Sequence, residues 1–208
     1  NSAALTSKAF GTSSIMIGDD ATGTIDAANY NTGVGVDVFA SLTTGDSNTA
    51  VGYITLDANT TGSSNVAIGY QSLSANTTAS NNTAVGYQSL AVNSTGTQNA
   101  AFGDSALISN TTGADNTALG AGSLASNTTA SHNTAVGRTA LLANTTGTQN
   151  SAVGKAALTA NTTANINTAL GYYALTANTT GANNTAIGAS SLGANTTADN
   201  NTSVGKDS

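Results

Sequence analysis

The nine residues Asn82–Leu90, NTAVGYQSL, decide the fold because nearly the same letters return every seventeen residues. Glycine holds the fifth place of every copy, and its spacing never slips from Gly18 to Gly205. The residue before this glycine is always apolar, and the residue four places after it is leucine in nine consecutive copies, from Leu56 to Leu192. The consensus unit is NTAVGYQSLxANTTGxx. A fixed internal period of this kind is typical of a repeat architecture.

The length of the unit selects the kind of repeat. Helical-hairpin repeats need roughly 33 to 47 residues, so seventeen is too short for them. One coil of a parallel β-solenoid fits, with two short strands joined by two turns. We expect NTAVG to form one strand, with Thr and Val on one face and Ala and Gly on the other, and SLxA to form a second. The predicted fold is therefore all-β, a parallel β-solenoid (β-roll) of about twelve coils.

The repeat phase also divides the chain. Residues 15–208 are expected to form the solenoid, with its first two coils degenerate, and residues 1–14 a partial coil or docking segment. The core of each coil is predicted to hold one Val-type and one Leu-type side chain. The free energy gained by burying these two side chains is small compared with the conformational entropy lost when the backbone of the coil is ordered. The small Ala and Gly face suggests close approach by another sheet. We therefore expect self-association, as a homotrimer or as a filament.

Composition excludes several classes of function. Only 7% of the residues are charged, and four basic residues face ten acidic ones for a net charge of -6, which disfavours nucleic-acid binding. The absence of cysteine removes disulfides and thiol chemistry. No apolar run approaches the roughly 18 residues of a membrane span, so no membrane insertion is expected in this segment. No cofactor or metal is expected, and no pair of candidate catalytic residues recurs, so the chain is not expected to be an enzyme.

One asparagine column is open to two interpretations. Every member begins an N-x-Ser/Thr sequon, which is an acceptor for N-glycosylation. Stacked asparagines also form hydrogen-bonded ladders in cross-β stacks, which makes a structural ladder the leading prediction. The column consists of Asn59, Asn76, Asn93, Asn110, Asn127, Asn144, Asn161, Asn178 and Asn195.

Two other groups of residues are candidates for contact with partners. Tyr53, Tyr70, Tyr87 and Tyr172 share the slot after the glycine, where they are candidates for binding surface glycans. Within the seventeen-residue unit, the position that Ser208 holds is followed directly by the position that Leu5 holds. The end of one chain could thus be continued by the start of another, which suggests head-to-tail stacking of subunits. The residues expected to dock end to end are Leu5, Phe10, Val204 and Gly205.

The stretches NTAVGYQSL and NTAIGASSL (Asn184–Leu192) resemble the head repeats of trimeric autotransporter adhesins and the similar repeats of phage tail fibres. The resemblance covers about residues 14–208. It implies a left-handed parallel β-roll with three chains side by side. The adhesin head repeat is shorter, so the NTTG turn is an elaboration, and the neck, stalk and anchor of that family have no counterpart in this sequence.

The leading functional expectation is a non-enzymatic structural protein, a fibre-forming or adhesin solenoid that is extracellular, on the cell surface or in a virion fibre. The alternative is a receptor- or glycan-binding head or shaft of a trimeric adhesin or tail fibre. A lower alternative is ice binding, which requires paired threonines facing outward from one strand. Here NTT is predicted to lie in a turn.

Overall fold

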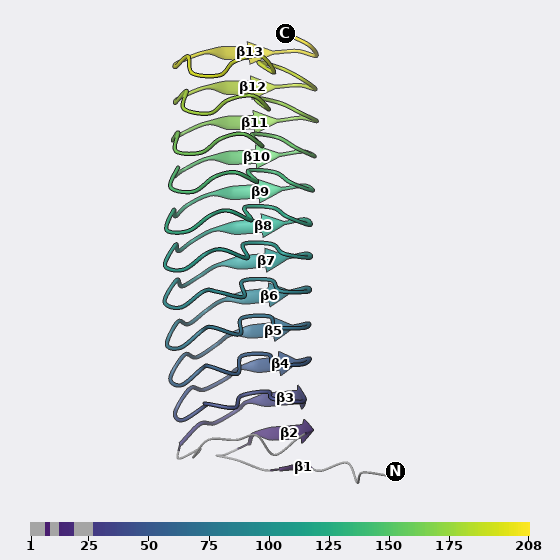
Figure 1. The fold of residues 1–208 in the computed structure, drawn as a ribbon, viewed down its shortest axis with the longest axis vertical. Helices are drawn as coiled ribbons and strands as arrows, with labels where there is room; N and C mark the ends of the chain where they lie inside the picture. Colours follow the sequence, from purple (N-terminus) through teal and green to yellow (C-terminus); the bar gives the residue numbers. More distant parts are fainter. Residues whose placement is uncertain (1–6, 9–12, 19–26) are drawn as a thin grey trace.

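The computed structural model describes residues 7–8, 13–18 and 27–208, and it shows a stack of short strands (Figure 1). The strands are β1 (Ser7–Lys8), β2 (Ile15–Gly18), β3 (Thr32–Gly35), β4 (Thr49–Val51), β5 (Val66–Ile68), β6 (Thr83–Val85), β7 (Ala100–Phe102), β8 (Thr117–Leu119), β9 (Thr134–Val136), β10 (Ser151–Val153), β11 (Thr168–Leu170), β12 (Thr185–Ile187) and β13 (Thr202–Val204). They form one sheet in sequence order. The proposed docking residues Leu5 and Phe10, and most of the predicted segment 1–14, lie outside the described residues.

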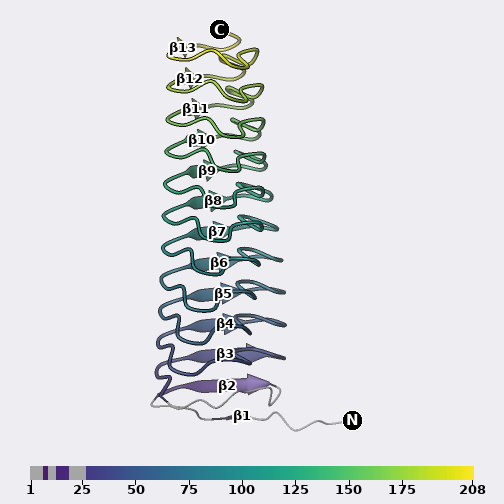
Figure 2. The same ribbon diagram turned by 60° about the vertical axis from the view of Figure 1, so that its left-hand side comes forward.

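Twelve of these strands are parallel and in register at a shift of seventeen residues. Thr83 pairs with Ala100 and Val85 with Phe102, and the same shift holds from β2 to β13. β1 alone pairs antiparallel, with β2. Figures 1 and 2 show the strands stacked in sequence order, with β1 and β2 at one end of the stack and β13 at the other. The all-β, parallel β-solenoid prediction is confirmed, with about eleven turns.

The prediction of two strands per coil is wrong, because each described coil has one strand of three or four residues. The SLxA segment is a chain of turns instead. Gln88 and Leu90 have φ angles of 51°, in the left-handed region, and the same holds for the leucines from Leu56 to Leu192. This region is unfavourable for a leucine and incompatible with an extended strand. Asn93 N–H donates to Leu90 O at 3.2 Å and closes the turn.

The predicted facing of the strand is also wrong. The middle residue of the strand points into the coil, as Ala84 and Ala101 do, and both are fully buried. The residue before the glycine points outward, and Phe102 and Leu119 keep 39% and 47% of their surface exposed. The Ala column is small because the opposite wall of the same coil lies close to it, not because a second chain does. The Val-type residue before the glycine therefore does not fill the core.

The core is a narrow shaft of stacked identical side chains. The fully buried leucines run through its centre from Leu56 to Leu175, and the strand alanines line one side of it. Polar side chains occupy the rest, and they bond to backbone groups inside the shaft. Ser89 Oγ, for example, donates to Ala101 O at 3.0 Å. Because buried polar groups are tolerated only when they are hydrogen-bonded, these polar columns must be satisfied coil by coil.

Candidate functional site

The nine sequon asparagines, here called the turn asparagines, form a continuous hydrogen-bonded ladder. From Asn76 onward the Nδ2 of each donates to Oδ1 of the previous one, as Asn110 does to Asn93 at 2.8 Å and Asn127 does to Asn110 at 2.9 Å. The same Nδ2 group donates to the carbonyl three residues ahead, as Asn127 does to Ala130 at 3.0 Å. The members from Asn59 to Asn178 are fully buried. An Nδ2 that is buried and donates two hydrogen bonds has no free side for a glycan.

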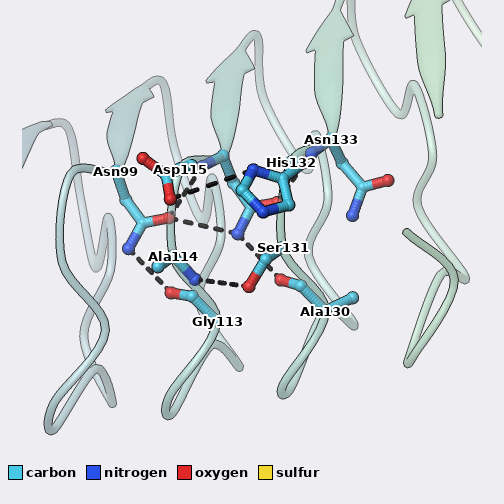
Figure 3. A network of polar contacts seen from close by, with 9 residues as sticks. Asn99, Gly113, Ala114, Asp115, Ala130, Ser131, His132 and Asn133 are labelled. Carbon is cyan, nitrogen blue, oxygen red and sulfur yellow. Dashed lines mark hydrogen bonds and ion pairs between the residues drawn. The ribbon is translucent and has the colours of Figure 1, made fainter. Parts of the chain in front are cut away.

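A second asparagine column precedes the strands, and we call its members the pre-strand asparagines. They run every seventeen residues from Asn31 to Asn201. Asn99 Oδ1 accepts the backbone N–H of Asn116 at 3.0 Å and its Nδ2 at 3.1 Å, while Asn99 Nδ2 donates to Gly113 O at 2.9 Å (Figure 3). Each inner member therefore bonds to the coils on both sides. The two asparagine columns add to the backbone hydrogen bonds that join the turns of one coil to those of the next.

Three of the four candidate tyrosines stack on one another at an exposed corner. The ring centroids of Tyr53 and Tyr70 lie 5.7 Å apart, and those of Tyr70 and Tyr87 lie 5.1 Å apart with an interplanar angle of 7°. Each ring is 41% to 52% exposed. Stacking covers both faces of the central Tyr70 ring and one face each of Tyr53 and Tyr87, which reduces the aromatic surface left for a sugar. Tyr172 stands apart from them, with Lys155 over its ring.

The end of the stack at β13 presents the other two docking candidates. Val204 is 69% exposed, and Gly205 N–H donates back to Ile187 O at 2.8 Å. An open hollow of about 530 Å³ lies over this last coil, lined among others by Leu192, Asn195 and Ser208. Its leucine is only partly buried, unlike those of the inner coils. Docking of another subunit at this end stays a prediction.

His132 lies near an acidic side chain from outside its own repeat unit. Its Nδ1 lies 3.9 Å from Asp115 Oδ2, which belongs to the preceding coil (Figure 3). The two side chains are 63% and 40% exposed, so this is a surface ion pair when the histidine is protonated. The neighbouring Ser131 Oγ accepts the backbone N–H of Ala114 at 3.0 Å. Ser131, His132 and Asp115 therefore do not line up as a hydrogen-bonded nucleophile, base and orienting acid.

One titratable group has a perturbed environment. Asp57 is half-buried, and its Oδ1 has no hydrogen-bond partner. Burial raises the pKa of this carboxyl above its usual value of 3.8, and the negative charge of Asp37 raises the pKa further. The backbone N–H groups of Asp57 and Ala58 lower it in part. The charged form of Asp57 is thus disfavoured by folding.

We therefore expect Asp57→Asn to stabilise the protein at neutral pH. A pKa raised on folding means that the folded state binds more protons, so stability falls as pH rises through the interval above 3.8. The melting temperature of Asp57→Asn should exceed that of the wild type at pH 7, and the two should converge below pH 3.8. Asp104→Asn, at an exposed corner, controls for the change in net charge. An Asp57→Asn protein less stable than the wild type at pH 7 would contradict this account.

The sequence prediction missed the largest exposed feature, which is the outward side of the sheet. We call it the outer face, and it consists of the first and third residues of each strand. The outward third residues form an unbroken apolar column along the stack, which includes Val34, Ile68, Phe102, Leu119, Val153, Leu170, Ile187 and Val204. Thr predominates in the first position, and no residue of the outer face is charged. The sequence signal that indicates this facing is side-chain size. The third strand position accepts Phe102 and Leu119, whereas the middle position is alanine in most strands.

No protein family, curated protein or solved structure matches this chain. Within the part of the chain that the structure describes, no helix has the length and hydrophobicity needed to cross a membrane. The described residues also contain no cluster of three or more His, Cys, Asp or Glu side chains placed to hold a metal ion. The features of the molecule that bear on function are therefore the outer face, the corner after the strand and the asparagine ladders.

Proposed function

We propose that this chain is a non-enzymatic, extracellular structural protein, a β-solenoid that self-associates side by side through its outer face. The observation that carries the proposal is the unbroken apolar column of that face, which is 37% to 69% exposed in most of its members. Monomeric soluble proteins rarely leave so long an apolar strip in water. A second copy of the chain offers a matching strip with the same period.

The chemistry of the outer face favours a second copy over an unlike partner. Twelve parallel strands spaced about 4.8 Å apart make a strip on the order of 50 Å long. No charge interrupts this strip, so two or three such faces can meet without burying an unpaired ion. The threonines beside the aliphatic residues supply hydroxyl groups at the rim. The asparagine ladders hold the strip straight and provide a mechanically continuous rod, as a fibre or adhesin shaft requires.

Lateral association is tested by placing charge on the outer face. The double variant Val153→Lys/Leu170→Lys should remain folded but run as a single chain of 20.1 kDa, whereas the wild type should have a multiple of that mass in light scattering. Burying two ammonium groups in an apolar interface is prohibitive. The matched control is Thr146→Lys/Thr163→Lys, which adds the same charges at the same seventeen-residue spacing in an exposed turn and should assemble as the wild type does. A wild type of 20.1 kDa at high concentration would contradict the proposal.

Electron microscopy separates the modes of assembly. Finite particles of two or three chains would support lateral association alone, and long filaments would add head-to-tail stacking.

The ice-binding alternative expected two outward threonines per strand. The outer face has at most one threonine beside one apolar residue, and Phe102 and Leu119 make it uneven. Thermal hysteresis in the purified protein would support that alternative against the present proposal.

A further inference from the structure

The basic residues of this acidic chain gather on one edge of the solenoid. We call this edge the corner column; it is the residue that follows the strand-end glycine in each coil. Three of the four basic residues belong to it, namely Arg138, Lys155 and Lys206. Ala156 N–H donates to Arg138 O at 3.0 Å, and Tyr173 N–H donates to Lys155 O at 3.1 Å. These bonds place Arg138, Lys155 and Tyr172 on three successive coils of the same edge.

Arg138 and Lys155 are neighbours of like charge without a counter-ion. Both are exposed, and one coil separates them, which corresponds to about 4.8 Å of rise. Among the residues that the structure describes, neither forms an ion pair, whereas Lys206 lies 3.5 Å from Asp207. Two adjacent cations repel each other at ordinary ionic strength unless an anion lies between them. A carboxylate or sulfate group in that place would accept charge-assisted hydrogen bonds from both.

An aromatic platform adjoins the two cations. Lys155 Nζ lies 5.5 Å from the ring centroid of Tyr172 and 5.8 Å from that of Tyr173. The two rings meet edge to face, with centroids 4.4 Å apart, and Tyr172 is 53% exposed. The next member of the corner column is Ala189, a methyl group, so no further ring stacks on Tyr172. The Tyr172 ring therefore combines exposed aromatic surface with an adjacent positive charge.

We propose that Arg138, Lys155 and Tyr172 form a binding subsite for an acidic polysaccharide. The two cations hold a carboxylate of a uronic acid residue, and the Tyr172 ring packs against the apolar C–H face of the adjoining sugar. A sugar chain that runs along the corner parallel to the stack meets both features in turn. Nucleic acid is the poorer occupant, because its closely spaced phosphates require several cations and only Arg138 and Lys155 lie on adjacent coils of the corner column. This subsite lies beside the outer face and does not depend on lateral association.

The probe is an oligogalacturonate, with a neutral cello-oligosaccharide of the same length for comparison, and binding is measured by isothermal titration calorimetry on the full chain. We expect the oligogalacturonate alone to bind, more weakly as salt is added. Arg138→Gln and Lys155→Gln should each lower the affinity roughly five- to tenfold, and Tyr172→Leu should lower it as well. Lys206→Gln is the matched control, since it removes a cation from the same column where Asp207 already pairs with it, and its affinity should equal that of the wild type.

Unchanged melting curves are expected for all four variants, because the corner column already accepts Tyr, Asp, Ala, Arg and Lys. The measurements are repeated on Val153→Ser/Leu170→Ser, which removes apolar surface from the outer face without adding cations beside the subsite, so that failure of self-association leaves the test of the subsite intact. No binding of oligogalacturonate would overturn the proposal. Equal binding of the neutral sugar, equal loss with Lys206→Gln, or tighter binding of single-stranded DNA would overturn it too.

Discussion

Gly120→Ala is expected to lower the free energy of unfolding by about 3 to 5 kcal/mol. Gly120 follows β8 with a φ of 136°, a conformation that only glycine adopts readily. A Cβ added there would lie 2.6 Å from the carbonyl carbon of Gly137 and 2.7 Å from its oxygen. The obstacle is the backbone of the next coil, which cannot turn aside as a side chain would. The substitution must therefore separate two coils or distort both.

Gly122→Ala, two residues away in the same turn, is the matched control. Gly122 also has a positive φ, of 67°, but the nearest atoms to its added Cβ lie 3.6 Å away, on Leu142 and Thr139. Ala156 holds the equivalent place in a later coil with a φ of 58°. The expected loss is about 1 kcal/mol. Denaturant unfolding followed by circular dichroism measures both variants, and equally small losses would show that the coils do not approach as closely as described.

Asn127→Ala is the second change with a large expected effect, a loss of about 3 to 5 kcal/mol. Asn127 is fully buried and satisfies three groups at once, because its Nδ2 donates to Asn110 Oδ1 and Ala130 O and its Oδ1 accepts Nδ2 of Asn144 at 3.0 Å. Alanine removes all three hydrogen bonds and leaves the buried Asn110 Oδ1 without a partner, whereas Ala130 O keeps its bond from Asn116 Nδ2 at 2.8 Å and Asn144 Nδ2 keeps its bond to Gly147 O at 2.9 Å. Buried polar groups that lose their partners cost about 1 to 3 kcal/mol each. Amide hydrogen exchange should report the opening first in the coils on either side.

Thr129→Ala tests whether Asn127 is needed for the hydrogen-bonded ladder or for the glycosylation sequon. Thr129 is exposed in the same turn, and its loss abolishes the N-x-Thr acceptor while the asparagine ladder remains whole. We expect Thr129→Ala to unfold within about 0.5 kcal/mol of the wild type. The reverse result, a stable Asn127→Ala protein and an unstable Thr129→Ala protein, would reject the ladder as the stabilising element. Mass spectrometry of the chain from a glycosylating host should show the buried asparagines unmodified.

The period, the fold class and the asparagine ladder could be predicted from the sequence because each depends on recurrence alone. A residue type that returns every seventeen positions must stack on itself, whatever the shape of the coil. The invariant glycine spacing also marks a backbone position that tolerates no side chain. These predictions needed no knowledge of which side of the strand is inside.

The facing of the strand could not be obtained from alternation, which is the same whether Ala84 or Val85 points inward. The choice is made by the width of the coil, since the leucine and two asparagines already fill most of the shaft and leave room for a methyl group only. Likewise, no local propensity favours a left-handed Leu90. Its conformation follows from burial of its side chain together with the hydrogen bond between Leu90 N–H and Ala106 O. Both features depend on the closed coil and so appear only in three dimensions.

The outer face is also where the proposed function is most directly measured. The chain has no cysteine, so Val153→Cys provides a single thiol in the aliphatic column and Thr146→Cys a single thiol in an exposed turn of the neighbouring coil. The measurement is the rate at which a maleimide labels each thiol in the native protein. If outer faces pack together, the Val153→Cys thiol should react roughly tenfold or more slowly than the Thr146→Cys thiol, and the two should react alike after unfolding. Equal rates in the native protein would contradict self-association through this face.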